Sequence, residues 1–305
     1  MTPPTFLVVG ATGNTGKGVV ELLPQLLQSS PAFKDHRILA LTRSKESAVA
    51  KHFASLPNVE VAEQNWTSIN AEWLLKENVV RAFVASHNEP SQFADEAGVN
   101  YVVRISTVGA VVRPDSRAYY PRTHWAIENL LSGAEYAALH WTSLQPNAFL
   151  PTMVADVAAY IKTYRETGTH SAFTTMLPES VPVGLIDPIE VGAFAAHLLA
   201  NEDTAPHNAK RYVLNGPEDI TGAQFVQLIE DHVGSRPQDV KFSDASIIDY
   251  MASQATASAA SVASIKYALR AMGQRLCKAD TTSKEVLEMA PPKRTAMILE
   301  DMLRA

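Results

Sequence analysis

A short apolar segment that runs directly into three closely spaced glycines most constrains the fold of this chain. Residues 6–9 (Phe-Leu-Val-Val) are followed by Gly-Ala-Thr-Gly-Asn-Thr-Gly at 10–16, and a helical apolar pattern continues over 19–27. The order of strand, glycine turn and helix is typical of a unit that binds a dinucleotide. A glycine triplet alone is weak support, but here the strand stands immediately before it and the helix immediately after it.

Each glycine has a separate expected task. Gly10 permits the tight turn out of the strand, Gly13 lets backbone approach a pyrophosphate, and Gly16 lets the helix pack closely. The helix N-terminus then offers unpaired N–H groups and a partial positive charge to the phosphates. The cofactor-binding residues predicted in this turn are Gly10, Thr12, Gly13, Asn14, Thr15 and Gly16.

The turn at 10–16 resembles the G-A-T-G-x-x-G sequence of the atypical short-chain dehydrogenase/reductases (SDR), in particular their NmrA-like branch. The more usual G-x-G-x-x-G turn has its second glycine where this chain has Thr12. The resemblance implies a Rossmann-type sheet that binds NAD(P) and a smaller, mostly helical C-terminal lobe that binds substrate.

Strand and helix patterns alternate along the first half of the chain, which predicts an α/β fold with a doubly wound parallel sheet. We expect an NAD(P)-binding Rossmann domain over 1–150 and a substrate-binding lobe over 151–305, with a return to the core sheet near 181–199. The Ala- and Ser-rich segment 253–264 fits either a closely packed helix or a lid, and the sequence leaves both open.

The end of the second expected strand, 37–42, selects the nicotinamide cofactor. NAD sites place a carboxylate there for the ribose 2′-hydroxyl, whereas NADP sites place an arginine for the 2′-phosphate. Arg43 follows this strand with Ser44 and Lys45 beside it, and the first acid is Glu46. A guanidinium can bind a phosphate through two hydrogen bonds, so the segment favours NADP(H), although a solvated basic turn would look the same.

Further cofactor contacts are expected at the carboxyl ends of later strands, where ligands of open α/β sheets bind. In the resembling family the turn after the third strand lies against the adenine, which makes Asn65 a candidate. Ser86 and His87 follow the apolar strand 79–85 and are candidates on the nicotinamide side. Pro146 and Asn147 belong to a segment that resembles the family's L-R-P-N-x-F sequence, with Gln145 where arginine is usual.

The candidate catalytic residues follow the fifth strand and open the next helix. Short-chain reductases use a tyrosine, a lysine four residues later and a serine. The resemblance places Tyr120 on the tyrosine, His124 on the lysine, and Ser106 or Thr107 on the serine, giving Y-x-x-x-H instead of Y-x-x-x-K. We expect Glu128, one turn further on, to fix the tautomer of His124 and to raise its pKa towards that of a general acid. A surface tyrosine and a helix-face pair of His124 with Glu128 are the alternative interpretation.

Two classes of function fit these residues. The first is an NADPH-dependent oxidoreductase that reduces a small, apolar carbonyl, quinone, enone or imine compound. The second is a non-catalytic NADP(H) sensor that acts through a protein partner, as regulators of the resembling family do. The hydroxyl pair and Tyr120 favour the enzyme, whereas the missing lysine favours the sensor or a less usual reduction. A fold alone does not choose between them.

Composition limits the binding partners and the cellular compartment that we expect for this protein. The formal net charge of −6 argues against nucleic-acid and anionic-membrane binding. The single cysteine, Cys277, has no internal disulfide partner, and no segment has the length or composition of a signal sequence or membrane span. We expect a cytoplasmic monomer or homodimer with a small-molecule substrate. His124 and Glu128 have no third ligand nearby, so no metal site is expected.

Overall fold

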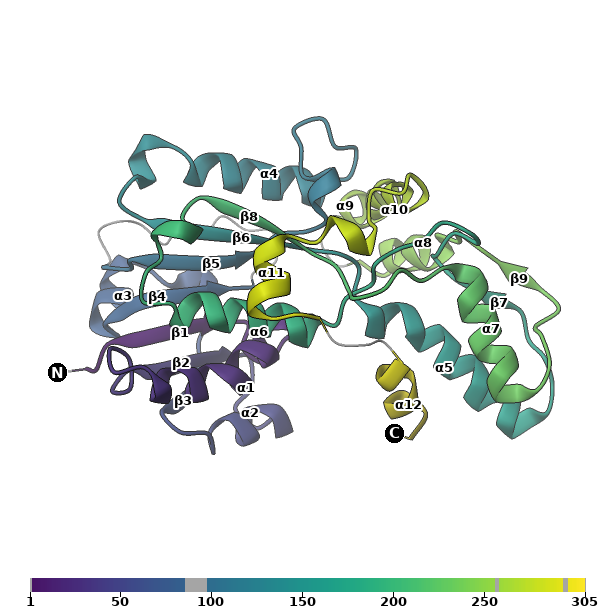
Figure 1. Cartoon of the computed structure of the whole chain (residues 1–305), viewed down its shortest axis with the longest axis horizontal. Helices are drawn as coiled ribbons and strands as arrows, with labels where there is room; N and C mark the ends of the chain where they lie inside the picture. The colour runs from purple at the N-terminus through teal and green to yellow at the C-terminus, as the bar shows by residue number, and fades with distance from the viewer. Residues whose placement is uncertain (1, 86–97, 256–257, 293–295, 305) are drawn as a thin grey trace.

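A parallel β-sheet forms the centre of the larger part of the molecule (Figure 1). The structure, a computed structural model, describes residues 2–85, 98–255, 258–292 and 296–304. The sheet has the strand order β3-β2-β1-β4-β5-β6-β8, and every neighbouring pair is parallel. The strands are β1 (Thr5–Val9), β2 (Arg37–Thr42), β3 (Val59–Glu63), β4 (Val79–Val84), β5 (Tyr101–Ile105), β6 (His140–Pro146) and β8 (Lys210–Leu214). The predicted doubly wound sheet is therefore confirmed.

Helices cover both faces of the sheet, because alternate residues of each strand point to opposite faces (Figure 1). Phe6 and Val8 join the core beneath one helix layer, whereas Leu7 and Val9 join the core on the other face. One layer contains α1 (Asn14–Ser29), α2 (Ala48–Phe53), α6 (Pro188–Ala200) and α11 (Lys284–Met289). The other contains α3 (Ala71–Lys76) and α4 (Tyr119–Leu131). The strand order changes direction between β1 and β4, where such folds bind their ligands.

Helices α1 and α6 pack in direct backbone contact through two glycines. A Cβ on Gly18 would lie 2.1 Å from the carbonyl oxygen of Ile189, and one on Gly192 would lie 2.1 Å from that of Thr15. No other residue fits at either position without moving a helix. This contact fixes the N-terminal half of α1, which immediately follows the glycine turn.

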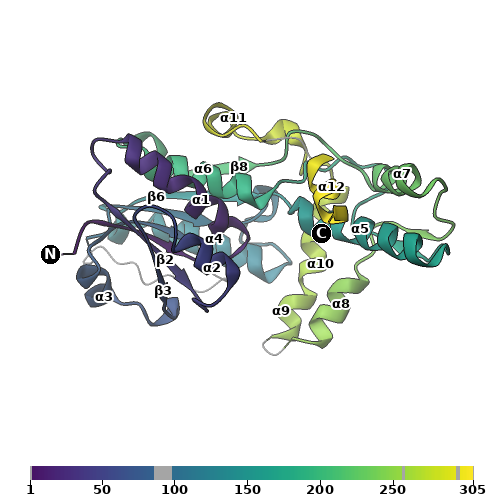
Figure 2. The same cartoon turned by 90° about the horizontal axis from the view of Figure 1, so that it is seen from below.

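The smaller part of the molecule is mostly helical and lies beyond the carboxyl ends of the strands (Figures 1 and 2). Its apolar core includes Val157, Ile161, Phe173, Phe225 and Ile229. Its elements are α5 (Leu150–Thr167), β7 (Phe173–Thr174), α7 (Gly222–Val233), β9 (Val240–Lys241), α8 (Ser246–Ser253), α9 (Ala259–Ala263), α10 (Ile265–Gly273) and α12 (Ala296–Arg304). None of the helices described is long and apolar enough to cross a membrane.

The chain passes between the two parts more than once. It leaves the sheet after β6, returns through α6 and β8, and returns again at α11. The return expected near 181–199 thus contains α6, and further segments rejoin the sheet after it. The side-chain amide of Asn147 joins the parts by donating to the carbonyl oxygens of Gly184 (3.0 Å) and Cys277 (2.9 Å).

The Ala- and Ser-rich segment has helix at both ends. It begins at the end of α8 and contains α9, which lies beside α8 (Figure 2). Buried Ser264 follows α9, and its hydroxyl oxygen accepts a hydrogen bond from the backbone N–H of Tyr119 (3.0 Å). This end of the segment therefore packs against the start of α4, which carries the candidate catalytic residues.

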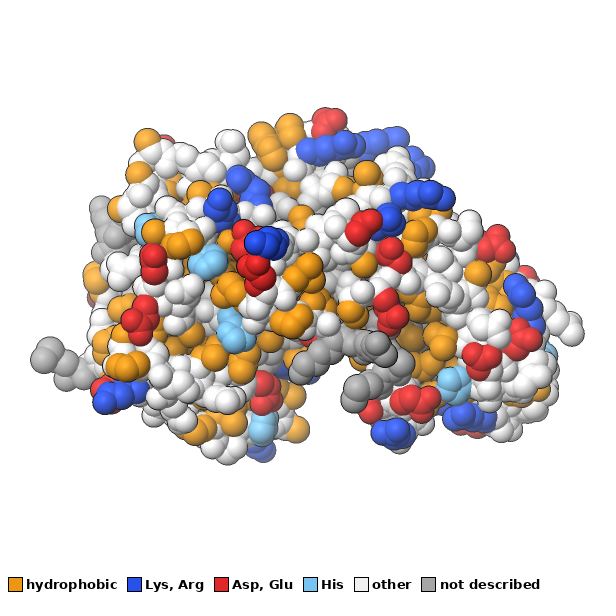
Figure 3. All heavy atoms as spheres, viewed as in Figure 1, with side chains coloured by type: hydrophobic (Ala, Val, Ile, Leu, Met, Phe, Trp, Pro, Cys, Tyr) orange, Lys and Arg blue, Asp and Glu red, His pale blue; other side chains and the backbone are white. Residues whose placement is uncertain are grey.

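Charge is distributed unevenly over the surface. Figure 3 shows Lys and Arg side chains gathered at the top of the view, over the loop before α4 and over α9 and α10. Arg113, Arg117 and Arg270 are exposed in these segments, and the guanidinium carbon of Arg117 lies 4.1 Å from the ring centroid of Tyr267. This end of an acidic protein is locally basic.

Candidate functional site

The three glycines of the turn differ in what surrounds them. Gly10 has φ +78°, a conformation that favours glycine, and a Cβ there would lie 3.0 Å from the Ala85 carbonyl oxygen. A Cβ on Gly16 would lie 2.1 Å from the carbonyl oxygen of Gly10. Gly13 is exposed, and its Cβ would meet only that same oxygen, at 3.1 Å. Gly10 and Gly16 are thus required by the turn itself, whereas Gly13 leaves room on the outside of the turn.

The N-terminus of α1 opens beside Gly13 without a cap. The N-cap residue, Gly13, has no side chain that could accept a hydrogen bond from the first turn of α1, and this turn contains no acidic residue. Its backbone N–H groups and helix dipole therefore suit an anion. The hydroxyls of Thr12 and Thr42 lie 3.3 Å apart, which links the glycine turn to the end of β2. These residues fit the pyrophosphate of a dinucleotide.

Arg43, Ser44 and Lys45 are exposed and directly follow β2. None of the ion pairs or cation–π contacts among the described residues uses the guanidinium of Arg43. The carboxylate of Glu63, at the end of the neighbouring strand, accepts a hydrogen bond from the backbone N–H of Lys45 (2.6 Å). A 2′-phosphate bound by Arg43 would thus lie near the carboxylate of Glu63 on the neighbouring strand. The backbone N–H of Lys45 holds this carboxylate in place.

Asn65 stands after β3, at the start of the 3₁₀ helix η1 (Trp66–Ser68). Its Oδ1 accepts hydrogen bonds from the backbone N–H (3.1 Å) and the hydroxyl (2.9 Å) of Thr67. Asn65 is exposed, and its Nδ2 donates no hydrogen bond among the described residues, so this atom is available for an adenine contact. Ser86 and His87 lie outside the described residues.

The end of β5 brings three of the candidate catalytic groups together. Ser106 is 5% exposed, and its hydroxyl has no hydrogen-bond partner among the described residues. Thr107 is half-buried and hydrogen-bonds the hydroxyl of Tyr120. Burial raises the pKa of Tyr120, and the bond to Thr107 opposes part of that rise. The unpartnered Ser106 hydroxyl is free to bind a ligand group at this edge of the sheet.

The expected partnership of His124 with Glu128 is wrong. The Nδ1 atom of His124 lies 2.7 Å from Nη2 of Arg104, and Glu128 makes no contact with the imidazole. Burial and the neighbouring guanidinium lower the pKa of His124 to about 3, instead of raising it. The imidazole is therefore neutral at pH 7. The structure does place it next to Tyr120, with the rings edge to face and their centroids 6.3 Å apart.

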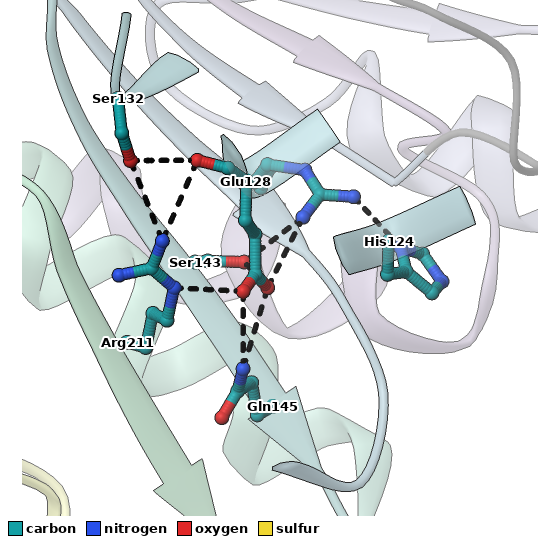
Figure 4. Close-up of polar contacts among 7 residues, drawn as sticks. His124, Glu128, Ser132, Ser143, Gln145 and Arg211 are labelled. Carbon is teal, nitrogen blue, oxygen red and sulfur yellow. Dashed lines mark hydrogen bonds and ion pairs between the residues drawn. The ribbon is translucent and has the colours of Figure 1, made fainter. Parts of the chain in front are cut away.

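Glu128 instead accepts hydrogen bonds from three other elements (Figure 4). Ser143 donates to Oε1 (2.7 Å), Nε of Arg211 donates to Oε2 (2.8 Å), and Nε2 of Gln145 lies 3.3 Å from each oxygen. Nη1 of Arg104 lies 3.5 Å from Oε1. The carboxylate, which is 2% exposed, is satisfied on both oxygens.

Sequence reasoning did not identify Arg104, Ser143 or Arg211. Arg104 pairs with Ser143 in the register of β5 and β6, and Ser143 pairs with Arg211 in that of β6 and β8. In-register residues of parallel strands share a face, so the three form a polar row beneath α4. A charged residue inside the apolar segment Val102-Val103-Arg104-Ile105 was the signal available in the sequence.

Pro146 and Asn147 stand at the end of β6, where both are buried. Nδ2 of Asn147 also donates to Asn215 (2.9 Å), and Oδ1 accepts from the backbone N–H of Ala148 (2.7 Å). The side chain is thus used within the protein, and its contact with a cofactor stays a prediction. A cavity of about 190 Å³ lies beside it, lined also by Val108, Gln145 and Leu276.

Cys277 is packed close to this region. It is buried, and burial raises the pKa of its thiol to about 11, so it is protonated at pH 7. No group of three potential metal ligands occurs in the part of the chain that the structure describes.

Comparisons with known proteins support the fold. No family model matches the sequence, and no curated protein matches it either. Among solved structures, the NADPH-dependent quinone oxidoreductase QOR2 from Escherichia coli, complexed with NADPH, is 18% identical with a TM-score of 0.68, covering 98% of this chain and 99% of that one.

Two further structures are similar over nearly their whole lengths. The triphenylmethane reductase of Citrobacter sp., complexed with NADP(H), is 19% identical with a TM-score of 0.65, covering 98% of this chain and 100% of that one. NmrA, a negative transcriptional regulator, in complex with NAD, is 12% identical with a TM-score of 0.63, covering 100% and 96%. The chain has the Rossmann-type fold of these proteins. NmrA itself is among them, as the resemblance in the glycine turn implied.

Proposed function

We propose that this protein is an NADPH-dependent oxidoreductase that reduces a small, apolar compound with a conjugated or polarised double bond, in the cytoplasm. One observation carries the proposal. The carboxyl edge of the sheet bears an anion-binding helix start beside Gly13 and, at the end of β5, the group Ser106, Thr107, Tyr120 and His124. A dinucleotide bound along this edge would reach from the first site to the second.

The phosphate-binding residues in this proposal are those of the turn and of the end of β2. Gly13 and the first turn of α1 would hold the pyrophosphate, and exposed Arg43 would hold the 2′-phosphate. The titles of two similar structures name NADPH or NADP(H) as their ligand. NADPH would supply a hydride at the end of β5.

The chain's own residues would orient the acceptor and stabilise the charge that forms on it. The lowered pKa of His124 leaves its ring already neutral at pH 7, and the raised pKa of Tyr120 keeps its hydroxyl protonated, so neither group is a ready proton donor. Hydrogen bonds from the Ser106 hydroxyl, the Tyr120 hydroxyl and the His124 ring can still stabilise a developing oxyanion. Such a site suits quinones and enones, because conjugation already spreads the negative charge of the reduced acceptor.

A cofactor sensor is the second candidate. Histidine stands at 124 in place of the lysine of the usual reductase pattern, and a regulator is among the similar structures. In this case NADP(H) would bind at the same turn, and a protein partner would recognise the cofactor-bound form of the protein.

Turnover separates the two candidates. Purified protein is mixed with NADPH and a panel of quinones, enones, imines and aldehydes, while NADPH oxidation and NADPH binding are measured separately. Oxidation that depends on the protein and on one class of acceptor supports the reductase. Tight NADPH binding without turnover of any class favours the sensor, and absence of binding contradicts both.

A further inference from the structure

His124 accepts a hydrogen bond from a group that cannot take one in return. Nη2 of Arg104 lies 2.7 Å from Nδ1 of His124, and a guanidinium has donors and no acceptor. Nδ1 must therefore be the unprotonated nitrogen, and the single proton of the neutral ring is on Nε2. Arg104 is itself held by Ser143, which accepts from Nη1 at 2.9 Å, and by the carboxylate of Glu128.

Burial and the charged groups around the imidazole keep it neutral. The nearest charge is the guanidinium of Arg104 on β5, and the carboxylate of Glu128 is occupied by Arg104 and, from β8, by Arg211. On α10, which packs on α4, Lys266 is paired with Asp249 and Arg270 lies over Tyr267. Tyr120 on α4 and Cys277, which acts electrostatically on Tyr120, are further titratable groups on this side among the described residues. Within the ranges that the structure describes, no acid therefore faces the ring to favour its protonation.

The protonated Nε2 has no acceptor within the described parts of the chain, although His124 is only 6% exposed. The Ser106 hydroxyl is a buried polar group of this site that also has no partner among the described residues. Two hydrogen-bonding groups thus remain available close to the edge of the sheet where ligands of this fold bind.

We propose that Arg104 is a positioning residue that fixes His124 as the neutral Nε2–H tautomer, so that Nε2 donates a hydrogen bond to the reacting oxygen and keeps its proton. This inference rests on the proposed reductase. Hydride would reach the conjugated carbon of a quinone or enone, the π electrons would move to the oxygen, and Nε2–H would stabilise the resulting oxyanion. The proton that completes the product would come from water.

The tautomer can be measured without any substrate. In ¹H–¹⁵N spectra of the whole protein labelled on histidine, the signals missing from His124→Gln identify His124. We expect an unprotonated Nδ1 and a protonated Nε2 that do not change between about pH 5 and about pH 8. A proton on Nδ1, or titration within this range, overturns the proposal whether or not the protein is a reductase.

Variants of the two arginines assign the effect to Arg104. In Arg104→Met, His124 should change tautomer or begin to titrate in the same range. Arg211→Met, which removes a guanidinium from Glu128 without touching the ring, is the matched control and should keep the wild-type spectrum. Unchanged His124 signals in a folded Arg104→Met protein contradict the proposal. If that variant does not fold, Arg104→Lys replaces it. The tautomer measured in the wild-type protein still tests whether His124 carries its proton on Nε2.

Kinetics then separate hydrogen-bond donation from proton transfer. Glutamine can place an amide N–H near the position of Nε2, but it cannot deliver a proton. His124→Ala should lower kcat by about 10²–10³-fold, as loss of an oxyanion donor does, whereas His124→Gln should stay within about tenfold of wild type. Equal losses in both variants would show that His124 transfers a proton.

Discussion

Nη1 of Arg104 lies 3.5 Å from Oε1 of Glu128, a long ion pair that Ser143 bridges with two shorter hydrogen bonds. Both charged side chains are buried. A buried charge is stable only when its hydrogen bonds are satisfied, and here the carboxylate has donors on both oxygens. The network therefore fixes α4, which carries His124, to β5, which carries Arg104, and to β6 and β8.

Removing the carboxylate of Glu128 should leave Arg104 and Arg211 without their shared ion-pair partner. We expect Glu128→Ala to lower the free energy of unfolding by about 3–5 kcal/mol, because breaking a buried pair leaves uncompensated charge. Glu60→Ala is the matched control, since Glu60 pairs with Arg37 but is 57% exposed, and it should cost at most about 1 kcal/mol. Urea unfolding measures both, and equal losses would contradict the role given to the network.

Two glycines of the turn should respond differently to a side chain. Gly13 has φ −78° and ψ 179°, which any residue can adopt, so Gly13→Val should remove NADPH binding and leave cooperative unfolding in place. Gly16→Ala should instead lower the free energy of unfolding by about 1–3 kcal/mol, because its Cβ would lie 2.1 Å from backbone. Thermal unfolding with and without NADPH measures both effects. Full stabilisation of Gly13→Val by NADPH would place the phosphates elsewhere.

Arg43 should select the phosphorylated cofactor. Loss of a charge-assisted contact costs on the order of 1.5–3 kcal/mol, so Arg43→Ala should weaken NADPH binding by roughly ten- to a hundredfold and leave NADH binding nearly unchanged. Lys45→Ala, which removes a neighbouring exposed cation, controls for general loss of positive charge. Titration of each variant with both cofactors decides the matter. Wild-type discrimination in Arg43→Ala would exclude it as the selector.

Local pattern was sufficient to predict much of the sheet. The segment 37–42 forms β2 with the expected bounds, and a third strand, β3, and a helix that carries Tyr120, α4, occur as expected. Here apolar periodicity and turn residues act within a few residues of one another. The glycine turn was equally predictable from the sequence, because its three glycines all belong to one local backbone conformation.

The partner of His124 could not be predicted in this way. Helix spacing placed Glu128 on the same face of α4, and that part of the prediction was sound. The face, however, packs on a row from β5, β6 and β8, whose register joins residues 104, 143 and 211. Register between such distant segments depends on the whole sheet. Arg104 therefore inserts between two residues that are neighbours on their helix.

The low pKa of His124 should appear in the pH dependence of stability. The unfolded chain binds a proton at this residue as pH falls through 6.5, whereas the folded protein does so only near pH 3. Stability is therefore greatest above 6.5 and is lost as pH falls towards 3. Between about pH 7.5 and about pH 5, His124 should account for a loss of about 2 kcal/mol. The difference in free energy of unfolding between wild type and His124→Gln, measured in urea at several pH values, isolates this loss, because the other histidines are common to both. A difference that stays constant with pH would mean that His124 titrates normally and that Arg104 does not control it.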